Sequence, residues 1–144
     1  MVSPSVLRKY QFPFIREMAG KCKERGIPFL YHSDGNVKEI IPELINMGVC
    51  ALHPLEPIAV DIYEIKKEYG DRLCLIGNID LGTVLVTGTV EEIIEDTKMH
   101  IQRLATGGGY CLGSSNSITY DVPIENYRAM IDTVMEFGRY PICV

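Results

Sequence analysis

The sequence predicts an α/β fold in which four short parallel strands alternate with helices. Short apolar runs of strand length alternate with longer segments of helical periodicity. The runs are apolar throughout, as is typical of parallel strands covered by helices. Each run also ends in polar residues, and this common rim favours a barrel over an open, flavodoxin-like sheet.

The first elements are two helices and a strand. Residues 4–10 predict a short helical turn. A second helix begins near Pro13, a residue suited to the first helical position, and ends at Gly26. The first strand follows at residues 28–34. Three residues mark the apolar face of the second helix: Phe14, Met18 and Cys22.

The next helix and strand have equally clear signals. Asn36 is expected to cap the helix, with Glu39 reaching back as in a capping box. Gly48 ends the helix, and the second strand covers residues 49–54. The core-facing stripe of this helix consists of Val37, Ile40, Ile41, Leu44 and Ile45.

The second half of the chain repeats the pattern. A helix at about residues 61–69 precedes a third strand at 73–77. Thr89 and Glu92 predict a capping box that opens a long helix, in which His100 is expected on a solvated face. The remaining elements are a glycine connector at 107–109, a strand at 110–113 and a helix at 124–137.

Polar side chains follow all four predicted strands, at the ends where ligand sites of parallel α/β proteins gather. They predict a ligand-facing surface. The candidate catalytic residues are His32, Asp34 and Asp80. The candidate substrate-binding residues are His53, Asn78, Ser114, Ser115 and Asn116.

Several of these positions also have a purely structural interpretation. Asp34 is a favoured residue for a turn that leads into a helix. His53 could be a core histidine hydrogen-bonded to a backbone carbonyl, and Asn78 and Asp80 could satisfy backbone groups in a turn. The sequence leaves both interpretations open.

A metal site is one use of the first two strand ends. His32 and Asp34 are two residues apart, so they point the same way on a strand. With Glu56 they offer one nitrogen and two oxygens, a set that suits zinc in an open catalytic site. Proton transfer is the competing use, with Asp34 orienting the His32 imidazole.

Composition narrows the classes of protein. At 144 residues and 47% apolar, the chain can bury one core, which predicts a single domain over residues 1–144. A net charge of −5 without a basic run argues against nucleic acid, and no apolar stretch is long enough for a membrane span. The N-terminus lacks a secretion signal. Five cysteines without a CxxC pair predict reduced, buried thiols in a cytoplasmic protein.

Four segments in this order resemble the uroporphyrinogen decarboxylase superfamily: FLYHSDG, LIGNID, GTVEEI and GGGYCLGSSNSITYDVPIENYRAM. The resemblance covers most of residues 4–138. It implies a (β/α)8 barrel of about twice this length, of which this chain is the C-terminal half with the last four strands. Four strands do not close a barrel, so we expect a homodimer or completion by a missing N-terminal half.

The resemblance implies two activities. Uroporphyrinogen decarboxylases remove carboxyl groups from the acetate arms of a tetrapyrrole without a cofactor. Cobalamin-dependent methyltransferases use zinc to activate a thiol that accepts a methyl group from a corrinoid, which adds a corrinoid protein as a partner. Their zinc histidine matches His32, but Asp34 and Asn116 replace the two cysteines. Asn116 also replaces a histidine of the decarboxylases. A decarboxylase-like enzyme is the first expectation, followed by a methyltransferase and by a non-catalytic, ligand-binding fragment.

Overall fold

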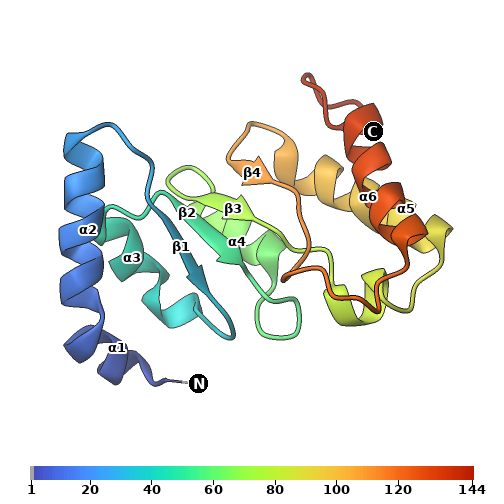
Figure 1. The fold of residues 1–144 in the computed structure, drawn as a ribbon. Helices are drawn as coiled ribbons and strands as arrows, with labels where there is room; N and C mark the ends of the chain where they lie inside the picture. Colours follow the sequence, from blue (N-terminus) through green and yellow to red (C-terminus); the bar gives the residue numbers. More distant parts are fainter. Residues whose placement is uncertain (1) are drawn as a thin grey trace.

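The computed structural model describes residues 2–144, which contain a four-stranded parallel sheet (Figure 1). The strands are β1 (Leu30–Ser33), β2 (Ala51–Pro54), β3 (Cys74–Ile76) and β4 (Tyr110–Cys111). They lie in the order β1-β2-β3-β4. A flavodoxin-like sheet reverses its strand order at a switch point, whereas a barrel adds its strands in sequence. The observed order confirms the α/β class and the barrel-type winding.

Helices precede or follow every strand, as the sequence predicts. A π-helical turn that the sequence did not predict, η2, follows β3, and a second π-helical turn, η3, continues α5. The helical segments are α1 (Pro4–Tyr10), α2 (Phe12–Glu24), η1 (Lys38–Ile40), α3 (Ile41–Met47), α4 (Ile62–Tyr69), η2 (Leu81–Leu85), α5 (Val90–His100), η3 (Ile101–Ala105) and α6 (Ile124–Phe137).

The capping box at the start of α5 is confirmed. Thr89 Oγ1 accepts a hydrogen bond from the Glu92 amide at 3.3 Å, and the Thr89 amide donates to Glu92 Oε2 at 2.8 Å. The box expected at Asn36 is wrong, because Asn36 Oδ1 accepts only from the Lys38 amide in a local turn. The physical reason is Pro42, which has no N–H and whose ring clashes with the carbonyl four residues earlier. The α-helix therefore begins at Ile41, and a 3₁₀ turn precedes it.

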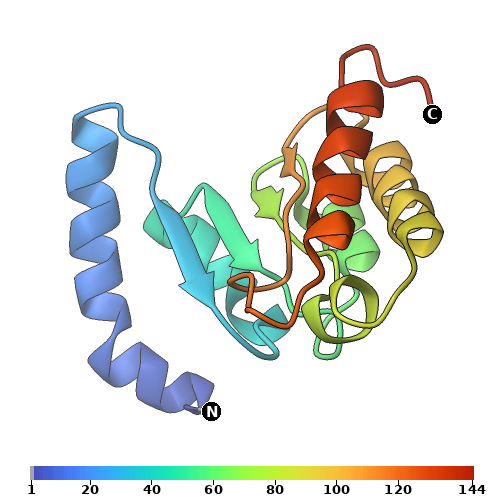
Figure 2. The same ribbon diagram turned by 45° about the vertical axis from the view of Figure 1, so that its right-hand side comes forward.

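Helices cover one face of the sheet, and the other face is open. Tyr31, Leu52 and Leu75 are buried and share the covered face, because the register pairs Tyr31 with Leu52 and Leu52 with Leu75. Figure 2 shows α2 beside β1 at one flank and α6 beyond β4 at the other, with the open face between them. The side chains on the open face include Leu30, His32, His53, Cys74, Ile76 and Cys111, all half-buried or exposed.

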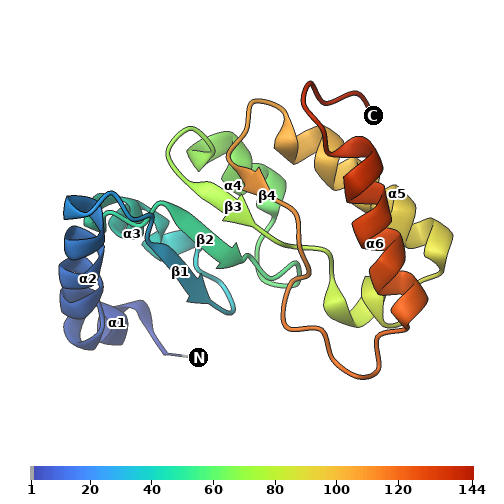
Figure 3. The same cartoon turned by 45° about the horizontal axis from the view of Figure 1, so that its top comes forward.

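Two apolar clusters stabilise this arrangement. The larger one joins α2, α3 and α4 to the covered face, with Leu44, Leu52 and Leu75 fully buried at its centre. The second one lies between η2, α5 and α6 around Leu85 and Ile93. In Figure 3, α5 and α6 stand together at the β4 end of the sheet. The strands thus sit on a packed layer of helices that fixes where their ends point.

The apolar face expected for α2 is wrong. Phe14 and Met18 are 63% and 45% exposed, whereas Phe12, Ile15 and Ala19 are buried. The helix carries two apolar stripes, and the one that begins at Phe12 packs towards α3. The second stripe, with Phe14 and Met18, is left exposed.

The five cysteines are free thiols, as expected, but the expectation that they are buried is wrong. Cys22, Cys50 and Cys74 are half-buried, while Cys111 and Cys143 are exposed. Within residues 2–144, the structure contains no helix with both the length and the apolar character of a membrane span.

Candidate functional site

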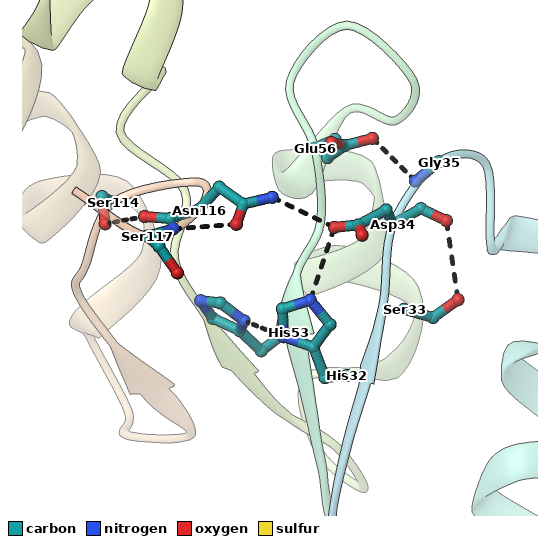
Figure 4. A network of polar contacts seen from close by, with 9 residues as sticks. All are labelled: His32, Ser33, Asp34, Gly35, His53, Glu56, Ser114, Asn116 and Ser117. Atoms are coloured by element: carbon teal, nitrogen blue, oxygen red, sulfur yellow. Dashed lines mark hydrogen bonds and ion pairs between the residues drawn. The ribbon is translucent and has the colours of Figure 1, made fainter. Parts of the chain in front are cut away.

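Two histidines meet at the carboxyl ends of β1 and β2. The register places His32 directly opposite His53, so both imidazoles project from the open face. Their Nδ1 atoms are 2.8 Å apart, close enough for one nitrogen to donate a hydrogen bond and the other to accept it (Figure 4). The ring centroids are 4.8 Å apart. The two rings therefore form a dyad that can share or pass a proton.

Asp34 extends this dyad. Its Oδ1 lies 3.4 Å from His32 Nε2, on the side of the ring that faces away from His53. Asn116 Nδ2 donates a hydrogen bond to the same oxygen at 3.2 Å, although 82 residues separate the two positions. Figure 4 shows the resulting chain of contacts from Asn116 through Asp34 and His32 to His53.

The loop after β4 holds Asn116 in place. Ser114 Oγ donates a hydrogen bond to the Asn116 carbonyl oxygen at 2.5 Å. The Ser117 amide donates to Asn116 Oδ1 at 2.8 Å, which turns the amide nitrogen towards Asp34. Ser117 was not among the candidates, because its contribution is a backbone amide and carries no side-chain signal.

The dyad has a distinct electrostatic environment. Partial burial, followed by the neighbouring His32 imidazole, lowers the pKa of His53 below its usual value. Two cationic rings at this separation would repel each other, so the pair favours states with at most one extra proton. That property suits a group that gives a proton to a substrate and recovers it from its neighbour.

Glu56 connects the loops after β1 and β2. Its Oε2 accepts a hydrogen bond from the Gly35 amide at 2.7 Å. Glu56, Asp80, Ser115 and Asn116 also line one hollow of about 450 Å³. This hollow is lined from three strand ends, whereas His32 and Asp34 line a separate hollow of about 300 Å³. The contact between Asp34 and Asn116 connects the two, and a single mouth shared by all four strand ends stays a prediction.

Asn78 lies deeper than the other candidates. It is 2% exposed, its amide nitrogen donates to the Leu55 carbonyl oxygen, and its Oδ1 lies 3.2 Å from His100 Nε2. The expectation that His100 lies on a solvated face is wrong, since the residue is 7% exposed and its Nδ1 lies 2.8 Å from the Asp96 carbonyl oxygen. The spacing of His100 from Ile93, seven positions earlier, could have revealed that it faces the core.

Asp80 and Ser115 bind backbone groups. Asp80 Oδ1 accepts hydrogen bonds from the Gly82 and Thr83 amides at 2.9 and 3.4 Å, which caps η2. Ser115 Oγ accepts from the Leu81 amide at 3.0 Å. These contacts shape the loop after β3, and one Asp80 oxygen is left for other contacts. The catalytic role of Asp80 stays a prediction.

The three proposed metal ligands come from the ends of neighbouring strands, but their side chains bind different partners. His32 and Asp34 contact each other, while Glu56 binds the Gly35 amide. Over residues 2–144, the structure contains no group of three or more His, Cys, Asp or Glu side chains arranged to hold a metal ion. The zinc set of His32, Asp34 and Glu56 stays a prediction.

The winding of the sheet, with polar groups at the strand ends, defines a barrel-type α/β protein. A solved methyltransferase from Methanosarcina mazei shares this fold, with a TM-score of 0.78 and 23% identity over 96% of this chain and 39% of that one. The family model for uroporphyrinogen decarboxylase (URO-D) matches residues 1–137. The chain therefore belongs to the uroporphyrinogen decarboxylase family.

Relatives with two kinds of activity match the chain. A uroporphyrinogen decarboxylase from Coxiella burnetii is 24% identical over 96% of the chain and 38% of its own length. A methylcobamide:CoM methyltransferase from Methanosarcina barkeri is 26% identical over 91% of the chain and 36% of its own length. The chain thus spans little more than a third of the relatives it matches.

Proposed function

We propose that this chain forms the C-terminal half of a decarboxylase-like barrel enzyme that removes carboxyl groups from the acetate side chains of a tetrapyrrole. The observation that carries the proposal is the 2.8 Å contact between His32 and His53, with Asp34 behind it. Loss of CO2 from an electron-rich pyrrole requires a proton for the substrate. A hydrogen-bonded imidazole pair supplies that proton without a cofactor.

The roles follow from the contacts. His32 donates the proton, and Asp34 orients the His32 ring from its far side. His53, whose pKa is lowered, is the neutral partner ring in contact with His32. Asn116 and Ser114 offer polar groups to the substrate, while Asn78 and Ser115 are buried and hold the loops around the site in place. Asp80, at the hollow shared with Asn116, is a second carboxyl group for proton transfer.

The substrate's carboxylates also need cations, and the rim of this half contributes few. We therefore propose that a second half barrel completes the site, either a second copy of this chain in a homodimer or an N-terminal half. Exposed apolar stripes at both flanks support this proposal. They consist of Tyr10, Phe14 and Met18 on α1 and α2, and of Ile124, Ile131 and Met135 on α6.

We retain two further proposals from the sequence, a cytoplasmic location and a single domain over residues 1–144. Neither adds a step to the mechanism.

Sedimentation velocity of the purified chain tests the half-barrel proposal, because it distinguishes a dimer from a monomer that requires another half.

Release of CO2 from uroporphyrinogen tests the activity. We expect turnover by the chain in its completed barrel. The kcat should fall at least 100-fold when His32→Ala removes the proton donor or His53→Ala removes its partner ring, at the low end of typical general-acid contributions. Thr106→Ala is the control, because Thr106 is exposed, lies before β4 and bonds through its hydroxyl to the Gln102 carbonyl oxygen, away from the proposed site. Normal turnover by both histidine variants would contradict the proposal.

The second candidate is a zinc- and corrinoid-dependent methyltransferase that acts with a corrinoid protein and transfers a methyl group to a thiol. It is favoured by the convergence of His32, Asp34 and Asn116, the positions that correspond to the zinc ligands of such enzymes. The donors do not fit a thiolate zinc site, since a carboxylate and an amide replace two sulfurs, and Asn116 directs its amide nitrogen to Asp34. We therefore derive no step through zinc.

Elemental analysis separates the candidates. Stoichiometric zinc that is lost in His32→Ala supports the methyltransferase. Absence of both zinc and CO2 release from the completed barrel supports a ligand-binding fragment without catalysis. Stoichiometric zinc retained in His32→Ala would contradict the proposed ligand set.

A further inference from the structure

Two cysteines face the open side of the sheet from neighbouring strands. Cys74 begins β3 and Cys111 ends β4, and their sulfur atoms are 4.0 Å apart. Cys74 is half-buried and Cys111 is exposed. Neither side chain contacts the dyad or the loops that form the proposed site, so this pair is a separate feature of the fold.

The strand register decides what can join the two sulfurs. Ile76 lies opposite Cys111. Cys74 comes two residues before Ile76 and is therefore the diagonal neighbour of Cys111. Neighbouring strands are about 4.8 Å apart and rise about 3.3 Å per residue, so an offset of two positions separates the Cα atoms by about 8 Å. Disulfides join Cα atoms roughly 4.4–6.8 Å apart. A direct S–S bond would therefore require the backbone of a packed sheet to move.

A single bridging atom fits without that movement. An ion about 2.3 Å from each sulfur, the usual zinc–thiolate distance, spans the 4.0 Å separation with an angle of about 120° at the metal. We propose that Cys74 and Cys111 bind a soft, thiophilic cation of the Cu(I) class. Thiolates select Cu(I), and this angle is that of three-coordinate Cu(I), whose third ligand would be a solvent molecule or an added donor; structural zinc requires four ligands.

One basic side chain lies near the pair. Binding displaces the two thiol protons, which leaves a bis-thiolate complex with one net negative charge. The Lys66 ammonium, which donates a hydrogen bond to the Gly108 carbonyl oxygen at 2.5 Å, is close enough to stabilise the Cys74 thiolate.

An anaerobic Cu(I) titration of the full chain, in competition with the chelator bicinchoninate, tests the site. We expect one tightly bound ion per chain. Cys74→Ser and Cys111→Ser should each weaken binding by at least about 100-fold, more than the loss of an outer-shell partner costs. Cys143→Ser is the matched control, because it removes an exposed thiol far from the pair in sequence and should change the affinity by less than about twofold.

Two further measurements on the unmodified chain do not depend on how the variants fold. X-ray absorption should show two sulfur ligands on the bound copper, and a shell of nitrogen or oxygen alone would overturn the proposal. Peroxide should leave the pair unlinked, and a peptide map with a Cys74–Cys111 disulfide would refute the geometric argument. Equal Cu(I) affinity in the Cys74→Ser, Cys111→Ser and Cys143→Ser variants would overturn the proposed copper site.

Discussion

Replacing Asn78 with alanine tests whether a buried amide holds the site together. The substitution leaves two groups without their partner, the Leu55 carbonyl oxygen and the His100 ring nitrogen. Each buried group left unsatisfied costs about 1–3 kcal/mol. Asn78 and His100 also line a hollow of about 450 Å³, through which water can reach part of the gap. We therefore place the loss at the low end, about 2 kcal/mol of unfolding free energy in total.

Urea denaturation followed by circular dichroism measures this loss. A change of about 2 kcal/mol corresponds to a decrease in Tm of roughly 4–8 °C for a chain of this size. Asn116→Ala is the control, since this asparagine is half-buried and its side-chain hydrogen bonds are open to solvent, so its removal should cost less than about 1 kcal/mol. If Asn78→Ala unfolds at the same urea concentration as Asn116→Ala, the amide does not anchor the loop after β2.

Three other predictions follow from local contacts. Because the folded-state pKa of His53 lies below its ordinary value of 6.5, stability should be full above that pH and decline as the pH falls through 6.5 towards the lower value. His53→Gln should flatten this decline in urea titrations at pH 5 to 8, and an unchanged slope would assign it to other groups. Thr89→Ala should cost about 1 kcal/mol by removing the α5 cap, with Thr89→Ser close to the parent chain in the same titration. Gly77→Ala should prevent normal folding, because its φ is +123° and a Cβ would stand 2.5 Å from the Pro54 carbonyl oxygen. Gly26→Ala, at φ +66° with open space around it, should cost only about 1–2 kcal/mol, and equal far-ultraviolet spectra and stability for both variants would contradict the clash.

The order of the elements was predictable because their signals are local. The Thr89–Glu92 box and the glycines that end α3 and α6 act within one helical turn, and the structure has them where the sequence places them. Pro42 is equally local, and attention to it would have placed the start of α3 at Ile41 instead of near Asn36. The errors on α2 and at His100 have another cause. Both segments carry apolar or amphipathic residues on more than one face, and only packing decides which face is buried.

The sequence by itself determined the alternation of helices and parallel strands and the polar character of every strand end, since both depend on residue type and short spacing. Only the tertiary structure decided that His32 faces His53 and that Asn116 reaches Asp34. Those pairs depend on strand register and on a sheet that brings distant segments together. The spacing of residues along one strand contains no information about which residue lies opposite on the next.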